Sequence, residues 1–101
     1  MVFVKVASVD KLPAGSMMGV EAGGKDVLIS NLGNKYYAIG NVCTHAGCRL
    51  SGGKLKGDNV TCPCHGSTFD VKTGTVVNGP AKKPEQTCKT KTEGNDILIW
   101  V

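Results

Sequence analysis

Two short segments decide the fold of this chain: CTHAGC at residues 43–48 and CPCHGS at residues 62–67. Each segment offers one thiol and one imidazole at close spacing, as Cys-x-His in the first and Cys-x-x-His in the second. Each also contains a further cysteine, Cys48 or Cys64, that is not a member of this pair. Thiolates and imidazoles are ligands for zinc and for iron, so the two segments together predict a metal centre.

The two segments match the ligation of one particular cluster. A Rieske [2Fe-2S] centre differs from other two-iron clusters because two histidines replace two cysteines on one iron. The chain resembles the Rieske iron-sulfur family in both segments, in Phe69-Asp70 and in Thr73-Gly74, and Asn78-Gly79-Pro80-Ala81 is similar to its proline loop. This resemblance covers most of the chain and implies a single Rieske domain over residues 1–101, with one 2Fe-2S cluster as cofactor.

The resemblance also implies the ligand set. Cys43 and Cys62 would hold the inner iron, and His45 and His65 would hold the outer iron. The two histidines would turn toward solvent and serve as the exit for the electron, with redox partners docking beside them. Because ferric iron acidifies a bound imidazole, we expect the redox potential to fall as pH rises past the pKa values of the oxidised state.

The remaining cysteines have different expected roles. Cys48 and Cys64 resemble the disulfide that ties the two loops together in Rieske proteins of respiratory and photosynthetic cytochrome complexes. Many ferredoxins that serve ring-hydroxylating oxygenases lack this pair. Cys88 stands opposite lysines in an alternating stretch, so we expect it to be a buried small hydrophobic residue.

Three further residues resemble positions that tune the cluster. Ser67 matches a serine whose hydroxyl bonds a cluster sulfide in high-potential members, whereas Phe69 stands where those members have a tyrosine. One hydrogen-bond donor to the sulfurs is therefore missing, which predicts a potential below that of the cytochrome-complex proteins. Pro80 would stiffen a loop that covers the cluster.

The rest of the sequence predicts an all-β chain, since its short segments are rich in Val, Ile and Thr and are separated by Gly and Asn. We expect the Rieske fold, an antiparallel β-sandwich, with a cluster-binding subdomain at about 42–66 and a proline loop at about 78–84. The segment 8–13 predicts one helical turn. The expected strands are 2–7, 16–22, 26–31, 35–40, 58–62, 68–71, 75–77, 86–92 and 96–101.

The net charge and the N-terminal sequence restrict the expected partners and the expected cellular location. The net charge of +4 and the pI near 8.9 favour an acidic partner, which lysines near the two segments could steer. These lysines are Lys54, Lys56, Lys82 and Lys83. The sequence contains no basic stripe interleaved with aromatic residues, so we do not expect it to bind nucleic acid. The first residues, MVFVKV, form neither a signal peptide nor a membrane anchor, so we expect a cytoplasmic protein, and a monomer.

Three functions remain open from sequence. The first is a soluble Rieske-type ferredoxin, an electron-transfer protein and not an enzyme, that passes single electrons from a reductase to an oxygenase or other terminal oxidoreductase. The second is the small Rieske subunit of a larger oxidoreductase such as nitrite reductase. The third is a structural zinc module, which two cysteines and two histidines would also suit.

Overall fold

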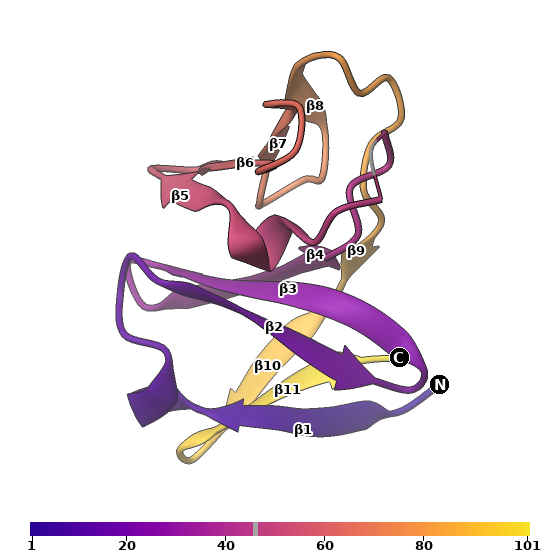
Figure 1. Cartoon of the computed structure of the whole chain (residues 1–101). Helices are drawn as coiled ribbons and strands as arrows, with labels where there is room; N and C mark the ends of the chain where they lie inside the picture. Colours follow the sequence, from indigo (N-terminus) through magenta and orange to yellow (C-terminus); the bar gives the residue numbers. More distant parts are fainter. Residues whose placement is uncertain (46) are drawn as a thin grey trace.

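The computed structural model describes residues 1–45 and 47–101, which form three antiparallel sheets and two short 3-10 turns (Figure 1). The strands are β1 (Phe3–Ser8), β2 (Met17–Ala22), β3 (Lys25–Leu32), β4 (Lys35–Gly40), β5 (Lys54–Lys56), β6 (Asn59–Thr61), β7 (Thr68–Asp70), β8 (Val76–Asn78), β9 (Thr87–Cys88), β10 (Thr90–Glu93) and β11 (Asp96–Trp100). The turns are η1 (Val9–Lys11) and η2 (Leu50–Gly52). The prediction of an all-β chain is confirmed.

The three sheets have separate places in the fold. The first sheet has the strand order β1-β11-β10, the second β2-β3-β4-β9 and the third β5-β6-β7-β8. In Figure 1 the first and second sheets lie against each other, and the third lies at the far side of the second sheet. No helix among the described residues has the length and hydropathy needed to cross a bilayer.

The second sheet separates two hydrophobic cores, because successive side chains of a strand point to opposite faces. Val27 and Ile29 of β3 pack with Ile97 and Ile99 of β11 in the base core. Leu28, between them in sequence, belongs instead to the cluster core on the opposite face. Each of these five residues is at most 2% exposed, and burying such a side chain is worth about 1.5–3 kcal/mol. The apolar run in β3 therefore reflects burial on both faces.

We call residues 42–85, which lie between β4 and β9, the cluster subdomain. The two ends of this subdomain lie close together, because β4 pairs with β9 through Ala38↔Cys88 and Ile39↔Thr87. The Gly40 amide also donates to the Gln86 carbonyl at 2.9 Å. We call the place where the two strand ends meet the neck. The core of the subdomain contains Cys43, Leu50, Val60, Cys62, Phe69, Val71 and Ala81.

The structure differs from the sequence prediction in three places. The third sheet runs from Lys54 to Asn78 and so continues past residue 66, where the expected subdomain ends. Strand β5 was not expected, because Leu55 is its single apolar residue. The predicted strand 86–92 is two strands, since β9 pairs with β4 in the second sheet and β10 pairs with β11 in the first. A change of partner sheet leaves no mark in the local residue pattern.

The structure also tests two smaller predictions. The helical turn expected within 8–13 is the 3-10 turn η1 at Val9–Lys11, whereas η2 was not expected. Cys88 is half-buried and packs against the base core, so its environment is less closed than the buried position that the sequence suggested.

Candidate metal centre

The first cluster loop, residues 43–48, is closed by two backbone hydrogen bonds. The Cys43 amide donates to the Cys48 carbonyl at 2.8 Å, and the Gly47 amide donates back to the Cys43 carbonyl at 3.0 Å. Gly47 has φ of +74°, a conformation in which a side chain would be strained. Ala46, inside this loop, lies outside the described residues.

The second cluster loop, residues 62–67, repeats this pattern. The Cys62 amide donates to the Ser67 carbonyl at 2.7 Å, and the Gly66 amide donates to the Cys62 carbonyl at 3.2 Å. Gly66 has φ of +78°. The two loops thus have the same spacing of five residues between the paired ends, and the same glycine turn one residue before the end.

The loops bury their thiols and expose their imidazoles. Cys43 and Cys62 are free thiols, each 2% exposed, within the cluster core. His45 and His65 are exposed, and their ring centroids lie 5.6 Å apart with the planes at 82°. The two segments that are far apart in sequence therefore bring one pair of sulfur donors inward and one pair of nitrogen donors to the surface.

This donor set fits a Rieske cluster in its chemistry. Such a cluster takes two thiolates on one iron and two imidazoles on the other, so no single iron needs three protein ligands. Within residues 1–45 and 47–101, no three His, Cys, Asp or Glu side chains gather around a point where one metal ion could bind. Two buried thiols and two exposed, facing imidazoles are compatible with the two-and-two division.

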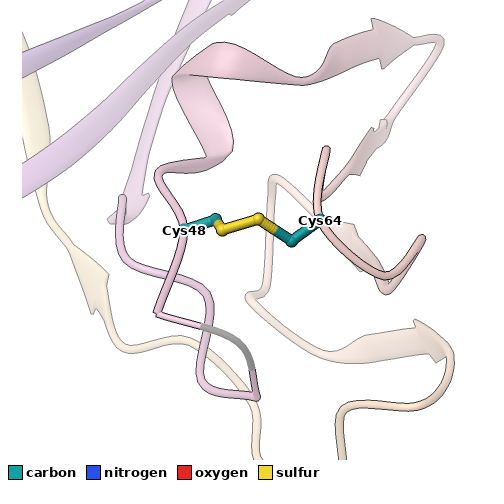
Figure 2. Close-up of a disulfide and its surroundings, with 2 residues drawn as sticks. All are labelled: Cys48 and Cys64. Carbon is teal, nitrogen blue, oxygen red and sulfur yellow. A yellow bond between two sulfur atoms is a disulfide. The ribbon is translucent and has the colours of Figure 1, made fainter.

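A disulfide joins the two loops (Figure 2). It links Cys48 to Cys64, whose Cα atoms are 6.3 Å apart and which are separated by 16 positions in sequence. Cys48 is half-buried against the cluster core, whereas Cys64 is exposed. The bridge joins the two loops covalently at Cys48, whose carbonyl also accepts the amide bond that closes the first loop.

The three expected tuning residues lie in different environments. Ser67 is fully buried, and its Oγ accepts a hydrogen bond from the Ala81 amide at 3.0 Å, which leaves the hydroxyl hydrogen free to donate elsewhere. Phe69 is fully buried in the same core as Cys43 and Cys62. Pro80 follows a cis peptide bond and is exposed at the surface.

The segment 79–85, which includes the expected proline loop, braces both cluster loops. Its Ala81 amide reaches Ser67 at the end of the second loop. The Thr44 hydroxyl of the first loop donates to the Lys83 carbonyl at 2.6 Å, and the Thr44 amide donates to Glu85 Oε2 at 3.1 Å. One short segment thus contacts both loops, although the loops are not adjacent to it in sequence.

Glu85 is a functional candidate that sequence reasoning missed. It is only 7% exposed, and burial raises its pKa to about 7, an effect that the hydrogen bond from the Thr44 amide partly opposes. The local sequence KKPEQ is polar and contains Pro, which is typical of a solvated loop. No local signal could have identified a buried carboxylate here.

Asn41 at the neck is the second feature that the sequence did not reveal. Asn41 is 1% exposed, and its Nδ2 donates to Asp26 Oδ1 at 2.9 Å while its Oδ1 accepts from the Ser51 amide at 2.8 Å. Arg49 Nε donates to Asp26 Oδ2 at 2.7 Å. The bonds from Arg49 and then Asn41 lower the pKa of Asp26 below its usual value.

The surface around the loops carries positive charge. Lys54 and Lys56 on β5 are exposed, as are Lys82 and Lys83 in the segment 79–85. A cavity of about 610 Å³ beside the second loop is lined by residues that include Lys54, Lys56 and Pro63. The lysines that the sequence placed near the loops are therefore near them in space as well.

Comparison with known proteins identifies the family. The sequence model of the Rieske [2Fe-2S] domain family matches residues 2–98. The ferredoxin component of biphenyl 2,3-dioxygenase from Rhodococcus jostii (strain RHA1) is 36% identical over 99 residues, 98% of this chain and 92% of that protein. The naphthalene 1,2-dioxygenase/salicylate 5-hydroxylase ferredoxin component from Ralstonia sp. is 33% identical over 97 residues, 96% of this chain and 93% of that protein.

Solved structures agree with the curated relatives. The ferredoxin of carbazole 1,9a-dioxygenase from Nocardioides aromaticivorans IC177 superposes with a TM-score of 0.93 at 31% identity, over 98% of this chain and 97% of that chain. The predicted fold is confirmed as the Rieske fold, and the predicted cofactor is confirmed as a Rieske [2Fe-2S] cluster. The chain therefore belongs to the Rieske [2Fe-2S] family, as a ferredoxin that carries electrons and is not itself a catalyst.

Proposed function

We propose that this ferredoxin passes single electrons from a reductase to the oxygenase component of an aromatic-ring dioxygenase system. The observation that carries the proposal is the division of the donor set, with thiols buried and imidazoles facing solvent. The relatives named above are ferredoxin components of dioxygenase systems, and they support the same class of terminal acceptor.

In this proposal Cys43 and Cys62 hold the inner iron, and His45 and His65 hold the outer iron. The cluster supplies a one-electron redox couple at about −150 to +300 mV, against about −400 mV for plant-type ferredoxins. Neutral imidazoles explain the difference, because they leave the core less negative than four thiolates would. The core around Cys43 and Cys62 excludes water from the sulfur side of the site.

The partners would dock at the surface that presents His45 and His65. Both rings are exposed, and an electron that leaves through them need not cross the protein core. The four exposed lysines near the loops would attract acidic surfaces of the reductase and of the oxygenase. A monomer leaves this surface open to both partners in turn.

The disulfide Cys48–Cys64 is the part of the site that resembles cytochrome-complex Rieske proteins, and we propose that it is retained in the working protein. A disulfide is unusual in the cytoplasm, where we place this chain, so its reduction potential must lie below that of the thiol pool. Mass determination with and without reductant on protein isolated under thiol trapping tests the bridge, and cell fractionation tests the location.

One experiment tests the proposed function. The purified holoprotein should contain iron and labile sulfide, lose its visible colour on reduction and then reduce an aromatic-ring dioxygenase oxygenase in a reconstituted system with an NADH-linked reductase. The rate should fall as salt rises, because screening weakens the attraction of the lysines. A cluster-loaded protein that fails to reduce such oxygenases, or that copurifies with a large catalytic chain, would favour the alternative of a subunit in a larger oxidoreductase.

The tuning of the potential has its own test. Phe69 lies in the core with both thiols, so Phe69→Tyr introduces a hydroxyl next to the cluster and should raise the midpoint potential by stabilising the more negative reduced form. Phe3→Tyr, on β1 in the first sheet, adds the same hydroxyl far from the site and is the matched control. Protein-film voltammetry measures both, and an unchanged or lower potential in Phe69→Tyr would contradict the mechanism.

A further inference from the structure

Glu85 is a buried carboxylate with no role in the ligand set. It lies at the neck, where the chain returns from the cluster subdomain to β9. Its Oε2 accepts the amide of Thr44 at 3.1 Å, across 41 positions of sequence. Thr44 stands between Cys43 and His45, so this contact holds the peptide that connects a proposed ligand of the inner iron to a proposed ligand of the outer iron.

The surroundings of Glu85 form a cradle of small residues. A Cβ atom added at Gly40 would lie 2.6 Å from Glu85 Oε1, and one added at Gly74 would collide with the Glu85 carbonyl. The Glu85 amide also donates to the Gly74 carbonyl at 2.8 Å. Two glycines thus leave the room that the Glu85 carboxylate and its backbone occupy beside Thr44.

Glu85 has no neutralising partner within the described residues. The four ion pairs of this part of the chain use other carboxylates: Asp96, Asp26, Asp58 and Glu93. A carboxylate with one amide donor and no cation remains a net negative charge when it is ionised, and at low solvent exposure such a charge acts over a longer distance than a surface charge does. The first cluster loop is the element that it contacts through its side chain.

We propose that Glu85 is a positioning residue for the cluster, which fixes the peptide between Cys43 and His45 and places a negative charge behind the first cluster loop. This inference rests on the proposed function, because it takes Cys43 and His45 as ligands. The fixed peptide sets the angle between the two ligands of the first loop. The negative charge opposes the arrival of an electron and holds the potential lower than the ligand set alone would.

Two variants separate the charge from the hydrogen bond. Glu85→Gln keeps a carbonyl oxygen that can accept the Thr44 amide but removes the charge. Glu85→Leu removes both and leaves a shorter apolar side chain in their place. Glu93→Gln is the control, since it removes one negative charge from the exposed β10 strand at the opposite end of the molecule from the third sheet (Figure 1).

The measurements are made on cluster-loaded protein at pH 8, above the pKa of about 7 that burial gives Glu85. The midpoint potential should shift to a more positive value in Glu85→Gln, with the EPR g values of the reduced cluster unchanged. Glu85→Leu should show the positive shift together with altered g values. Glu93→Gln should match the wild type in both readouts.

Specific results would overturn the inference. A potential of Glu85→Gln equal to that of Glu93→Gln would refute the electrostatic role, and unchanged g values in Glu85→Leu would refute the positioning role. If Glu85→Leu does not fold, Glu85→Gln alone still decides the electrostatic role, and Gly40→Ala, which crowds Oε1, replaces it for the positioning role. A wild-type protein that binds no cluster would contradict the proposed function instead, and this outcome is visible before any variant is measured.

Discussion

The two cluster loops have the same local backbone but different supports. Each loop pairs its cysteine amide with the carbonyl five residues later and turns at a glycine with positive φ. The first loop then leans on Glu85, beside the neck, through a bond that spans 41 positions. The second loop is supported by Ala81, whose amide donates to Ser67 Oγ across 14 positions.

The shape of each loop and its placement therefore have separate causes. The shape follows from neighbouring residues, because the backbone bonds and the glycine turn lie inside each six-residue segment. The placement follows from contacts with distant residues, of which one is charged and the other is neutral. Both supports come from the same segment, 79–85, so that segment sets where the loops stand relative to each other.

We expect the largest effect from removing the buried thiol that each loop provides. Cys43→Ser and Cys62→Ser should each abolish the cluster, because each removes one of the two buried sulfur donors that we propose for the inner iron. Iron and labile sulfide analysis with visible spectroscopy checks the loss. Cys88→Ser, which removes the third free thiol of the described residues, should keep a full cluster. Retention of the cluster in either loop variant would contradict the ligand assignment.

We expect the second largest effect from removing the disulfide between the loops. The double variant Cys48→Ser/Cys64→Ser opens a loop that spans 16 positions, which should lower the free energy of unfolding by about 3 kcal/mol in the chain-entropy model. Urea denaturation monitored at the cluster absorbance measures it. Each single variant should lose a similar amount, since both break the same bond. A double variant as stable as the wild type would show that the bridge does not constrain the chain.

The support of the second loop comes third. Ser67→Ala leaves the Ala81 amide without its buried acceptor and should cost about 2 kcal/mol of unfolding free energy. It should also lower the midpoint potential, if the free hydroxyl hydrogen bonds a cluster sulfide. Ser67→Thr keeps the hydroxyl and should restore part of both losses. A stability loss without a change in potential would mean that Ser67 braces the loop but does not tune the cluster.

The smallest effect is the pH dependence of the first loop's support. The pKa of Glu85 is about 7 in the folded chain, above its ordinary value of 4.5. The folded state therefore binds more protons than the unfolded state between pH 4.5 and 7, and stability is lost as pH rises through this range. The loss should be about 1 kcal/mol, because solvent screens part of the buried charge.

Glu85→Gln checks this sign. Its melting temperature should fall less than that of the wild type as pH rises over the same range, because the amide does not titrate. Asp26 behaves in the opposite sense, since Arg49 and Asn41 lower its pKa, so its contribution is lost as pH falls below the ordinary range of an aspartate. A wild type whose stability rises relative to Glu85→Gln between pH 4.5 and 7 would contradict the buried carboxylate.

Much of the fold was accessible from the sequence because its signals are local. The β-rich segments, the turns between them and the helical turn before residue 13 depend on residues close in the chain. The strand 86–92 was wrong as one strand, because the change from β9 to β10 is a change of partner sheet. The third sheet continues past residue 66, the end of the expected subdomain, because β7 pairs with β6 and β8 pairs with β7.

The sequence alone was enough to predict the four candidate ligands Cys43, His45, Cys62 and His65, because they lie in two segments short enough for their spacing to indicate metal chemistry. How those segments are held depends on contacts that form in the folded chain alone. The burial of Glu85 and Asn41 depends on partners 41 and 15 positions away, and a polar residue in a loop has the same local appearance whether it is solvated or buried. Whether a polar residue is buried depends on the rest of the folded chain, and packing at the neck buries these two residues.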